Sequence, residues 1–215
     1  MAPLTLPSTA RWRVAVTQRR LPGSAMSSAR DALDAEWSDW FCANASWAQF
    51  LPLPNFAAPD QALHWLAGWG VNALLLTGGE DVGSSDVRDA LELGLIQHAR
   101  QQRWPVLGVC RGMQMLHREA GGELIAIEDH VGQPHRLQAP WPDQTVNSWH
   151  RWGIRELAEG WQATALSVDG SVEAMRHRDL PWLGLMWHPE RPQGAADLTR
   201  AWLAQIFTLA DSRGP

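Results

Sequence analysis

Residues 104–112 read Trp-Pro-Val-Leu-Gly-Val-Cys-Arg-Gly, and this stretch decides the fold. The apolar residues before Cys110 predict a short buried strand. The residues after the turn, 113–120, have the pattern of a helix, which the glycines at 121 and 122 end. The sequence therefore predicts a strand, a tight turn and a helix, with Cys110 in the turn.

Cys110 lies between Gly108 and Gly112, a spacing typical of the nucleophile elbow with cysteine in place of serine. An elbow nucleophile takes a strained backbone conformation, so its neighbours must be small, and its side chain stands clear of the sheet. The helix N-terminus beneath it carries partial positive charge, which favours a thiolate over a thiol. A buried cysteine in a glycine-containing turn has the same pattern, and these residues alone do not separate the two interpretations.

Strand and helix patterns alternate along the chain, which predicts an α/β fold with a mostly parallel sheet covered on both faces. At 215 residues we expect one domain over 1–215, with its core at about 12–209. The apolar spacing of the helix expected at 85–103 puts Val87, Leu91, Leu95 and Ala99 on one face. We expect strands at 13–17, 71–76, 104–109, 161–166, 171–176 and 182–187, and an extended piece at 50–54. We expect helices from residue 28 onward and at 59–69, 85–103, 113–120 and 194–209. Residues 123–154 are expected to form short strands and loops.

Charge and composition exclude several classes of function. The chain has a net charge of −5, and all 18 of its basic residues are arginine. A mildly acidic chain without a basic run is a poor binder of nucleic acid or of a membrane surface, so we expect neither as a partner. The absence of lysine excludes Schiff-base chemistry. We interpret the 14 tryptophans as residues of the core and of pocket walls.

Two cysteines, Cys42 and Cys110, indicate a reducing compartment rather than a disulfide framework. Cys42 follows Trp40 and Phe41 in a helical pattern, and we expect it to be buried and inert. Residues 1–10 lack the basic and apolar regions of a secretory signal, and no apolar run approaches the length of a membrane span. We therefore expect a cytoplasmic protein.

Two further motifs follow predicted strands, where the active sites of such sheets lie. In 74–81, Leu-Leu-Leu-Thr-Gly-Gly-Glu-Asp, two glycines directly follow a buried strand. The N–H groups of Gly79 and of Arg111, the residue after the cysteine, are candidates for an oxyanion hole. A plain Gly-Gly turn is the alternative and the commoner meaning of this dipeptide.

The second motif, Gly-Leu-Met-Trp-His-Pro-Glu at 184–190, ends the last predicted strand. Residues two apart in an extended segment point the same way, so His188 and Glu190 can lie on one side. A thiol activated by an imidazole, which a carboxylate orients, needs this order of groups.

Together, Gly-Gly-Glu-Asp, Gly-Val-Cys-Arg-Gly-Met-Gln and Trp-His-Pro-Glu resemble the class I glutamine amidotransferase superfamily. Within it, the chain is similar to the stand-alone γ-glutamyl hydrolases, the group that includes γ-glutamyl-γ-aminobutyrate hydrolase. The resemblance implies a flavodoxin-like three-layer fold and hydrolysis of a γ-glutamyl amide of a small molecule. It implies Cys110 as nucleophile, His188 as general base and acid, and Glu190 as the group that orients His188.

The resemblance also implies residues that bind the γ-glutamyl group. Gln114 corresponds to a contact with that group, and Ser148, Trp149 and His150 lie in the segment that holds the glutamate α-carboxylate. The chain departs from its relatives in three places, which concern the leaving group rather than the chemistry. Arg151-Trp152 replaces a second histidine and a glutamine, Met186 stands where glutamine is frequent, and Val82-Gly83 lacks the usual proline.

A narrower resemblance rests on 16–20, 32–37, Val-Asn-Ser-Trp-His and Trp-His-Pro-Glu-Arg. These segments are similar to a subgroup that hydrolyses γ-glutamyl nucleotide amidates, such as γ-glutamyl-CDP-amidate, in making the phosphoramidate of bacterial surface polysaccharides. Arg19, Arg20 and Arg191 are then candidates for a phosphate contact, because a guanidinium fork suits phosphate. Ordinary surface arginines are the alternative.

We expect no cofactor and no metal. Asp129, His130 and His135 invite a metal interpretation, but the segment holds no third ligand at a recognisable spacing. The alternative function is the glutaminase subunit of a two-chain amidotransferase, with a synthetase as partner. Two other classes of function remain open: a redox or carbonyl-stress protein with an elbow cysteine, and a catalytically silent interaction protein. The protein could also form a homodimer.

Overall fold

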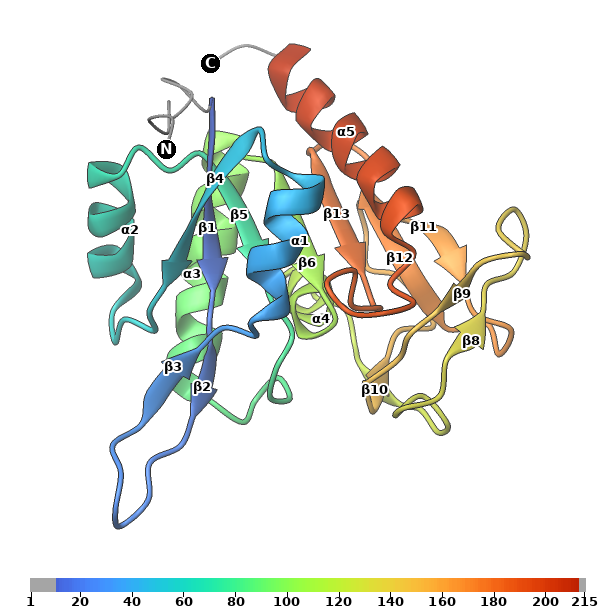
Figure 1. Cartoon of the computed structure of the whole chain (residues 1–215), viewed down its shortest axis with the longest axis horizontal. Coiled ribbons are helices and arrows are strands. Elements are labelled where there is room, and N and C mark those ends of the chain that lie inside the picture. Colours follow the sequence, from blue (N-terminus) through green and yellow to red (C-terminus); the bar gives the residue numbers. More distant parts are fainter. Residues whose placement is uncertain (1–10, 213–215) are drawn as a thin grey trace, which may run out of the picture.

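Seven strands form the central sheet, in the order β11-β12-β13-β6-β5-β1-β4 (Figure 1). The computed structural model describes residues 11–212, so the expectations for residues 1–10 lie outside the described part. Strands β4, β1, β5, β6 and β13 run parallel, while β12 is antiparallel to both β13 and β11. The predicted mostly parallel sheet is therefore confirmed. The strands are β1 (Trp12–Thr17), β4 (Ala48–Leu53), β5 (Ala73–Leu76), β6 (Val106–Val109), β11 (Trp161–Leu166), β12 (Val172–His177) and β13 (Trp182–Leu185).

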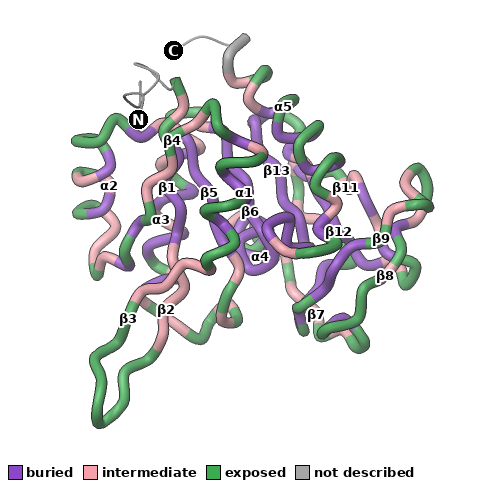
Figure 2. The backbone as a smooth tube through the Cα atoms, viewed as in Figure 1, coloured by how far each residue is buried: buried purple, intermediate pink, exposed green. Residues whose placement is uncertain are grey.

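Two apolar cores lie on the two faces of the sheet, because side chains alternate along each strand. In β1, Val14 and Val16 belong to one core and Ala15 to the other. The first core takes side chains from α1 and α5, and the second from α2, α3 and α4. These helices form the outer layers of a three-layer α/β fold, and the inner strands β5, β6 and β13 between them are wholly buried (Figure 2). The helices are α1 (Glu36–Asn44), α2 (Pro59–Gly68), α3 (Asp86–Gln102), α4 (Arg111–Glu119) and α5 (Ala196–Ser212).

The three motifs meet at one edge of the sheet because their strands are neighbours. Strand β6 lies between β5 and β13, with Leu76 beside Gly108 and Val109 beside Leu185. The three strands run parallel and end at nearly the same level. Each motif therefore leaves the sheet at its carboxyl edge, as the strand order of such folds requires.

The segment from residue 19 to 35 differs from the prediction. A helix was expected from residue 28 onward, but the structure has a hairpin of β2 (Arg19–Leu21) and β3 (Arg30–Ala32), and α1 begins only at Glu36. Asp31 holds the hairpin in place, because its carboxylate accepts hydrogen bonds from Arg20 and from both the backbone N–H and the side chain of Asn55. These tertiary contacts outweigh the local helical pattern.

The prediction for Cys42 is wrong, and the predicted apolar face of α3 is incomplete. Cys42 is exposed rather than buried, because α1 presents Trp37, Trp40 and Phe41 to the core and residue 42 lies beyond that stripe. In α3, Val87 is only partly buried and the buried position beside it belongs to Arg88. The spacing of apolar residues cannot predict that a charged side chain such as Arg88 is buried together with its ion-pair partner.

Between α4 and β11 the chain forms short strands and loops, as predicted. Two small ladders pair β7 (Ile125–Ala126) with β10 (Trp152–Gly153), and β8 (His135–Arg136) with β9 (Thr145–Val146). They lie beside β11 and β12 near the carboxyl edge (Figure 1). In the described part of the chain, no helix is both long and apolar enough to cross a membrane.

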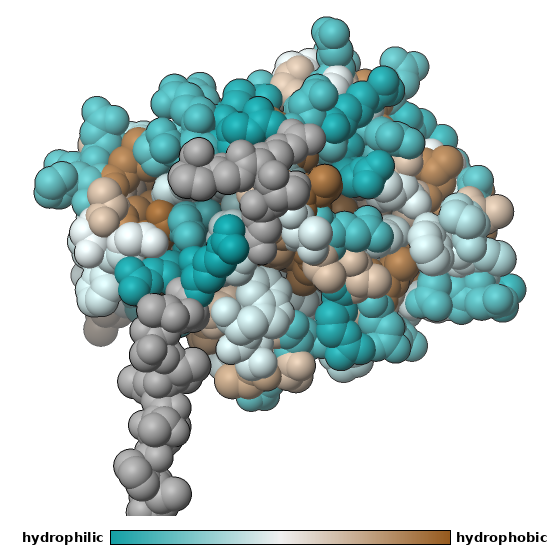
Figure 3. All heavy atoms as spheres, turned by 90° about the horizontal axis from the view of Figure 1, so that it is seen from above, coloured by the Kyte–Doolittle hydropathy of each residue, from teal (hydrophilic) through white to brown (hydrophobic). Residues whose placement is uncertain are grey.

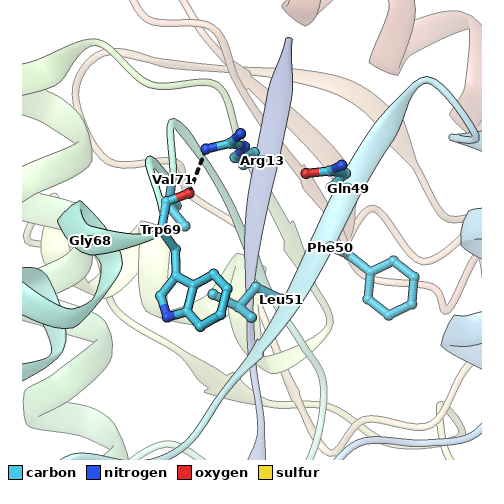
Figure 4. A pocket seen from close by; sticks show the side chains of 7 residues that line it. All are labelled: Arg13, Gln49, Phe50, Leu51, Gly68, Trp69 and Val71. Carbon is cyan, nitrogen blue, oxygen red and sulfur yellow. Dashed lines mark hydrogen bonds between the residues drawn. The ribbon is translucent and has the colours of Figure 1, made fainter. Parts of the chain in front are cut away.

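The opposite, amino edge of the sheet carries a separate cavity of about 490 Å³. Arg13 crosses this cavity and donates a hydrogen bond to the Trp69 carbonyl at 2.9 Å (Figure 4). Figure 3 looks onto this end of the molecule, where hydrophilic side chains dominate with hydrophobic ones between them. The cavity lies at the starts of β1 and β5, so it is distant from Cys110. Its lining residues are Arg13, Gln49, Phe50, Leu51, Gly68, Trp69 and Val71.

Candidate active site

Cys110 has the strained backbone of a nucleophile elbow. Its φ of 51° and ψ of −107° lie in a region that costs a non-glycine residue about 1–3 kcal/mol. The turn is tight because the chain passes close to itself: a Cβ added at Gly112 would lie 2.1 Å from the Leu76 carbonyl oxygen, and one at Gly108 would lie 2.7 Å from the Gly112 carbonyl. Only glycine fits these two positions, so the small neighbours that the elbow requires are present.

The His188 imidazole lies between Cys110 and Glu190. Its Nδ1 is 2.6 Å from Glu190 Oε1, and the imidazole also interacts electrostatically with the Cys110 side chain. Both side chains of the pair are almost fully buried. Burial lowers the pKa of His188, but the charge and hydrogen bond of Cys110, joined by those of Glu190, outweigh it and raise the pKa to about 9. The raised pKa favours a protonated His188 at neutral pH.

Asn147 fixes the backbone of His188. The His188 N–H donates to Asn147 Oδ1 at 2.8 Å, and Asn147 Nδ2 donates to the His188 carbonyl at 2.9 Å and to the Pro192 carbonyl at 2.8 Å. The sequence interpretation assigned Asn147 no role. The motif Val-Asn-Ser-Trp-His contains Asn147, but the sequence does not predict its contact with His188, which lies 41 residues away.

The Gly-Gly turn after β5 is held by the guanidinium of Arg88. Its Nη2 donates to the carbonyls of Thr77 at 2.9 Å and Gly78 at 3.0 Å, while Nη1 donates to Glu80 at 2.8 Å. Gly79 has a φ of +146°, and a Cβ there would lie 2.4 Å from Arg88 Nη1. Arg88 thus sets the path of the backbone that carries the proposed oxyanion donor, and sequence analysis missed it.

The backbone N–H and the side chain of Arg111 have different surroundings. It is the first residue of α4, so its N–H has no acceptor within the helix. Its buried guanidinium points into a charge network with Glu92 and Asp89. Burial alone would raise the pKa of Glu92, but the charges of Arg111 and Arg88 lower it below its usual range. Arg88, Glu92 and Arg111 therefore form a buried network beneath the elbow.

The residues expected to hold the γ-glutamyl group have mixed surroundings. Gln114 is buried and donates to the Trp152 carbonyl at 2.9 Å. The Ser148 hydroxyl donates to the His130 carbonyl at 2.5 Å, and His150 Nδ1 bonds the same Trp152 carbonyl at 3.0 Å. Trp149 is 52% exposed. The substrate-binding role of these four residues stays a prediction.

The three arginines proposed for phosphate lie in different environments. Arg20 pairs with Asp31 at 2.9 Å, and Arg191 pairs with Asp34 at 2.6 Å and lies over the Trp149 ring. Arg19 lines a small pocket with Thr77, Gly78 and Glu190, and its buried Nε has no hydrogen-bond partner among the described residues. Arg19 and Arg191 thus both lie beside the catalytic candidate Glu190, with Arg191 Nε 3.8 Å from Glu190 Oε1.

A second cluster of titratable groups lies near this site, around Glu173 of β12. The structure brings His130, His135 and His150 to this carboxylate, although the sequence offered no third ligand for the first two. Burial lowers the pKa of His150 to about 4, although the charge of Glu173 opposes the shift. Strand β12 was predicted, but residue spacing could not predict that its Glu173 contacts His130 in the loop before β8.

With this geometry in place, the comparisons with known proteins define the class. The profile described as "Glutamine amidotransferase class-I" matches residues 54–203, and the chain belongs to this family. The chain is 27% identical over 201 residues to γ-glutamyl-CDP-amidate hydrolase of Campylobacter jejuni, covering 90% of this chain and 98% of that protein. It is 29% identical over 142 residues to γ-glutamyl-γ-aminobutyrate hydrolase of Escherichia coli O157:H7, covering 52% and 56% of the two chains.

Solved structures show the same fold. A glutamine amidotransferase of Thermotoga maritima superimposes with a TM-score of 0.61 at 17% identity, covering 95% of this chain and 86% of that one. The resemblance read from the three motifs is therefore confirmed at the level of family and fold.

Proposed function

We propose that this protein hydrolyses a γ-glutamyl amide through Cys110, His188 and Glu190, with release of glutamate and an amine. One observation carries the proposal: the His188 imidazole interacts with the elbow cysteine and is hydrogen-bonded to a buried carboxylate. This is the arrangement that activates a nucleophilic thiol. The two named γ-glutamyl hydrolases among the relatives support the same reaction class.

In the first half-reaction, the Cys110 thiolate attacks the γ-carbonyl carbon. The carbonyl oxygen becomes negative, and the N–H groups of Gly79 and Arg111 donate hydrogen bonds to it. The protonated His188 then gives its Nε2 proton to the amide nitrogen. The C–N bond breaks, the amine leaves, and a γ-glutamyl thioester remains on Cys110.

In the second half-reaction, the neutral His188 takes a proton from water. The resulting hydroxide attacks the thioester carbonyl, and the tetrahedral intermediate expels the Cys110 thiolate as glutamate forms. Glu190 holds His188 in one tautomer and stabilises its charged form throughout. The enzyme returns to its starting protonation state.

The finer proposal concerns the leaving group. We infer a γ-glutamyl nucleotide amidate, because the relative that matches 98% of its own length has a substrate of this kind. Arg19, with its unpartnered Nε beside Gly78 and Glu190, is the candidate for the phosphate, and Trp149 offers an exposed ring near Arg191. Gln114, Ser148 and His150 are the candidates for the glutamyl part.

Glutamate release from a panel of γ-glutamyl compounds tests the proposal. The panel holds glutamine, γ-glutamyl-aminobutyrate, γ-glutamyl peptides and a γ-glutamyl-nucleotide amidate, with C110A as the inactive control and C42S as the matched cysteine control. We expect selective turnover of the nucleotide amidate by the wild type and C42S only. Turnover of glutamine alone, and only with a partner chain, would instead support the glutaminase subunit.

A further inference from the structure

Three imidazoles surround one buried carboxylate outside the proposed catalytic site. Glu173 is fully buried in β12. Its Oε1 lies 3.1 Å from His135 Nε2, 3.6 Å from His130 Nδ1 and 3.8 Å from His150 Nε2. Loop 130–135, segment 148–152 and strand β12 thus each contribute to one cluster.

The facing atoms of the cluster have no good hydrogen bonds. Both carboxylate oxygens of Glu173, His130 Nδ1, His135 Nε2 and His150 Nε2 are buried and lack a partner of hydrogen-bond geometry among residues 11–210. A buried carboxylate left without hydrogen bonds costs several kcal/mol. A cation held by His130, His135 and Glu173 would give each of these three side chains a partner.

The outer nitrogens of two histidines are already engaged. His150 Nδ1 contacts the Trp152 carbonyl at 3.0 Å, so Nδ1 carries the hydrogen and the Nε2 lone pair faces the cluster. His130 Nε2 lies 3.4 Å from Asp169 Oδ2, which leaves Nδ1 facing Glu173. Metal-binding histidines use carbonyls and carboxylates in this way to fix their tautomer.

Three of these side chains are grouped closely enough to hold a zinc-class ion. The potential ligand atoms of His130, His135 and Glu173 lie within 4.8 Å of one another. Zinc binds histidine nitrogen and carboxylate oxygen at about 2.0–2.2 Å. Calcium and magnesium prefer oxygen ligands, so two imidazoles beside a carboxylate favour zinc or a similar transition metal.

We propose that His130, His135 and Glu173 bind one zinc-class divalent cation, with His150 Nε2 facing the same carboxylate. The site is structural, because its buried ligand atoms lie outside the proposed catalytic residues. The cation ties β12 to loop 130–135, whose His130 carbonyl accepts a hydrogen bond from Ser148. Because Ser148 is a candidate for the glutamyl part, the site supports the proposed substrate pocket without taking part in the reaction.

Metal content and zinc titration test this proposal. Protein purified without chelator or histidine tag is analysed for bound metals by mass spectrometry, and apo-protein is titrated with zinc by calorimetry. The measurements use C110S alongside the wild type, because the Cys110 thiolate and His188 can bind zinc themselves. H64Q, an exposed histidine on α2, is the matched control.

We expect about one zinc per chain in the wild type, C110S and H64Q, and loss of that zinc in H135A and E173Q. Zinc is expected to raise the unfolding temperature of C110S and H64Q but not that of H135A. If E173Q does not fold, H135A alone still tests the proposal. Cobalt in the C110S site is expected to show the intense visible bands of tetrahedral coordination. Zinc that is lost in C110S and kept in H135A, or a wild type that binds zinc more weakly than about 10 μM, overturns the proposal.

Discussion

Asn147 and His188 exchange two hydrogen bonds, from the His188 N–H to Asn147 Oδ1 at 2.8 Å and from Asn147 Nδ2 to the His188 carbonyl at 2.9 Å. Asn147 directly follows β9, and His188 lies shortly after β13. The pair therefore joins the loop region to the segment that carries the proposed catalytic histidine. Because Asn147 is buried, these bonds are shielded from water and fix the position from which the imidazole extends.

Asn147→Ala removes this clamp and leaves the His188 N–H and carbonyl unsatisfied. We expect a loss of about 2–4 kcal/mol in the free energy of unfolding, measured by urea denaturation. If Asn147 positions His188, kcat falls more than tenfold while KM changes little, and the pH profile of kcat shifts. A variant that is less stable yet keeps the wild-type kcat and pH profile would reduce Asn147 to a purely structural residue.

Arg88→Met tests the guanidinium that holds the Gly-Gly turn. The change removes the guanidinium from one oxygen of Glu80 and one of Glu92, while Glu80 Oε1 keeps the Arg20 N–H, and we expect about 3–5 kcal/mol of destabilisation. Loss of the Gly79 donor lowers kcat and kcat/KM by the same factor, because an oxyanion hole acts in the transition state. Arg88→Lys keeps the charge without the fork, and we expect it to fold with reduced kcat.

Arg100→Met is the matched control on the same helix. Arg100 is 38% exposed in its ion pair with Glu119, so its removal costs about 1 kcal/mol or less. Equal effects of the two substitutions on stability and kcat would contradict a special role for Arg88.

The raised pKa of His188 predicts how stability depends on pH. The folded-state pKa is about 9 against an ordinary 6.5, so the folded protein favours the protonated imidazole. This contribution is complete below about pH 6.5 and is lost as the pH rises through about 9. We expect the free energy of unfolding to fall across that window in the wild type.

NMR titration of the imidazole checks the origin of this shift. We expect the His188 midpoint to drop in C110S, which removes the charged sulfur, and in E190Q, which removes the carboxylate. The pH-dependent loss of stability then shrinks in both variants. A midpoint near 6.5 in the wild type would show that the thiolate–imidazolium pair does not form.

Gly112→Ala probes the closeness of the elbow to β5. The added Cβ would lie 2.1 Å from the Leu76 carbonyl oxygen, so we expect a loss of about 3 kcal/mol or more in stability. Gly68→Ala is the control, because a Cβ there meets nothing within 4 Å, and the change is expected to be neutral or slightly stabilising. The unfolding temperatures of both variants test this prediction. An unchanged unfolding temperature for G112A would contradict the close contact between the elbow and β5.

The elements that sequence could predict are those that rest on local patterns. The elbow, the buried strands around it and the order of the three motifs follow from apolar periodicity and glycine placement within a few residues. Pro52 is consistent with the position of β4, since proline is tolerated in an edge strand.

The remaining features depend on contacts between distant residues. The hairpin of β2 and β3 depends on Asp31 meeting Asn55, and the buried position of Arg88 depends on carboxylates of its own helix and of the Gly-Gly turn. The cluster at Glu173 needs three segments to meet on β12. No periodicity encodes such pairings, because each partner alone has the pattern of an exposed polar residue.

Locating the covalent intermediate tests the proposed nucleophile most directly. Protein incubated with the γ-glutamyl substrate is quenched in acid, digested and mapped by mass spectrometry, with C110A and C42S treated in parallel. We expect a glutamyl group on the peptide that contains Cys110 in the wild type and C42S, and neither adduct nor glutamate release in C110A. Glutamate release that persists in C110A, or a glutamyl group on a different residue, would contradict this prediction.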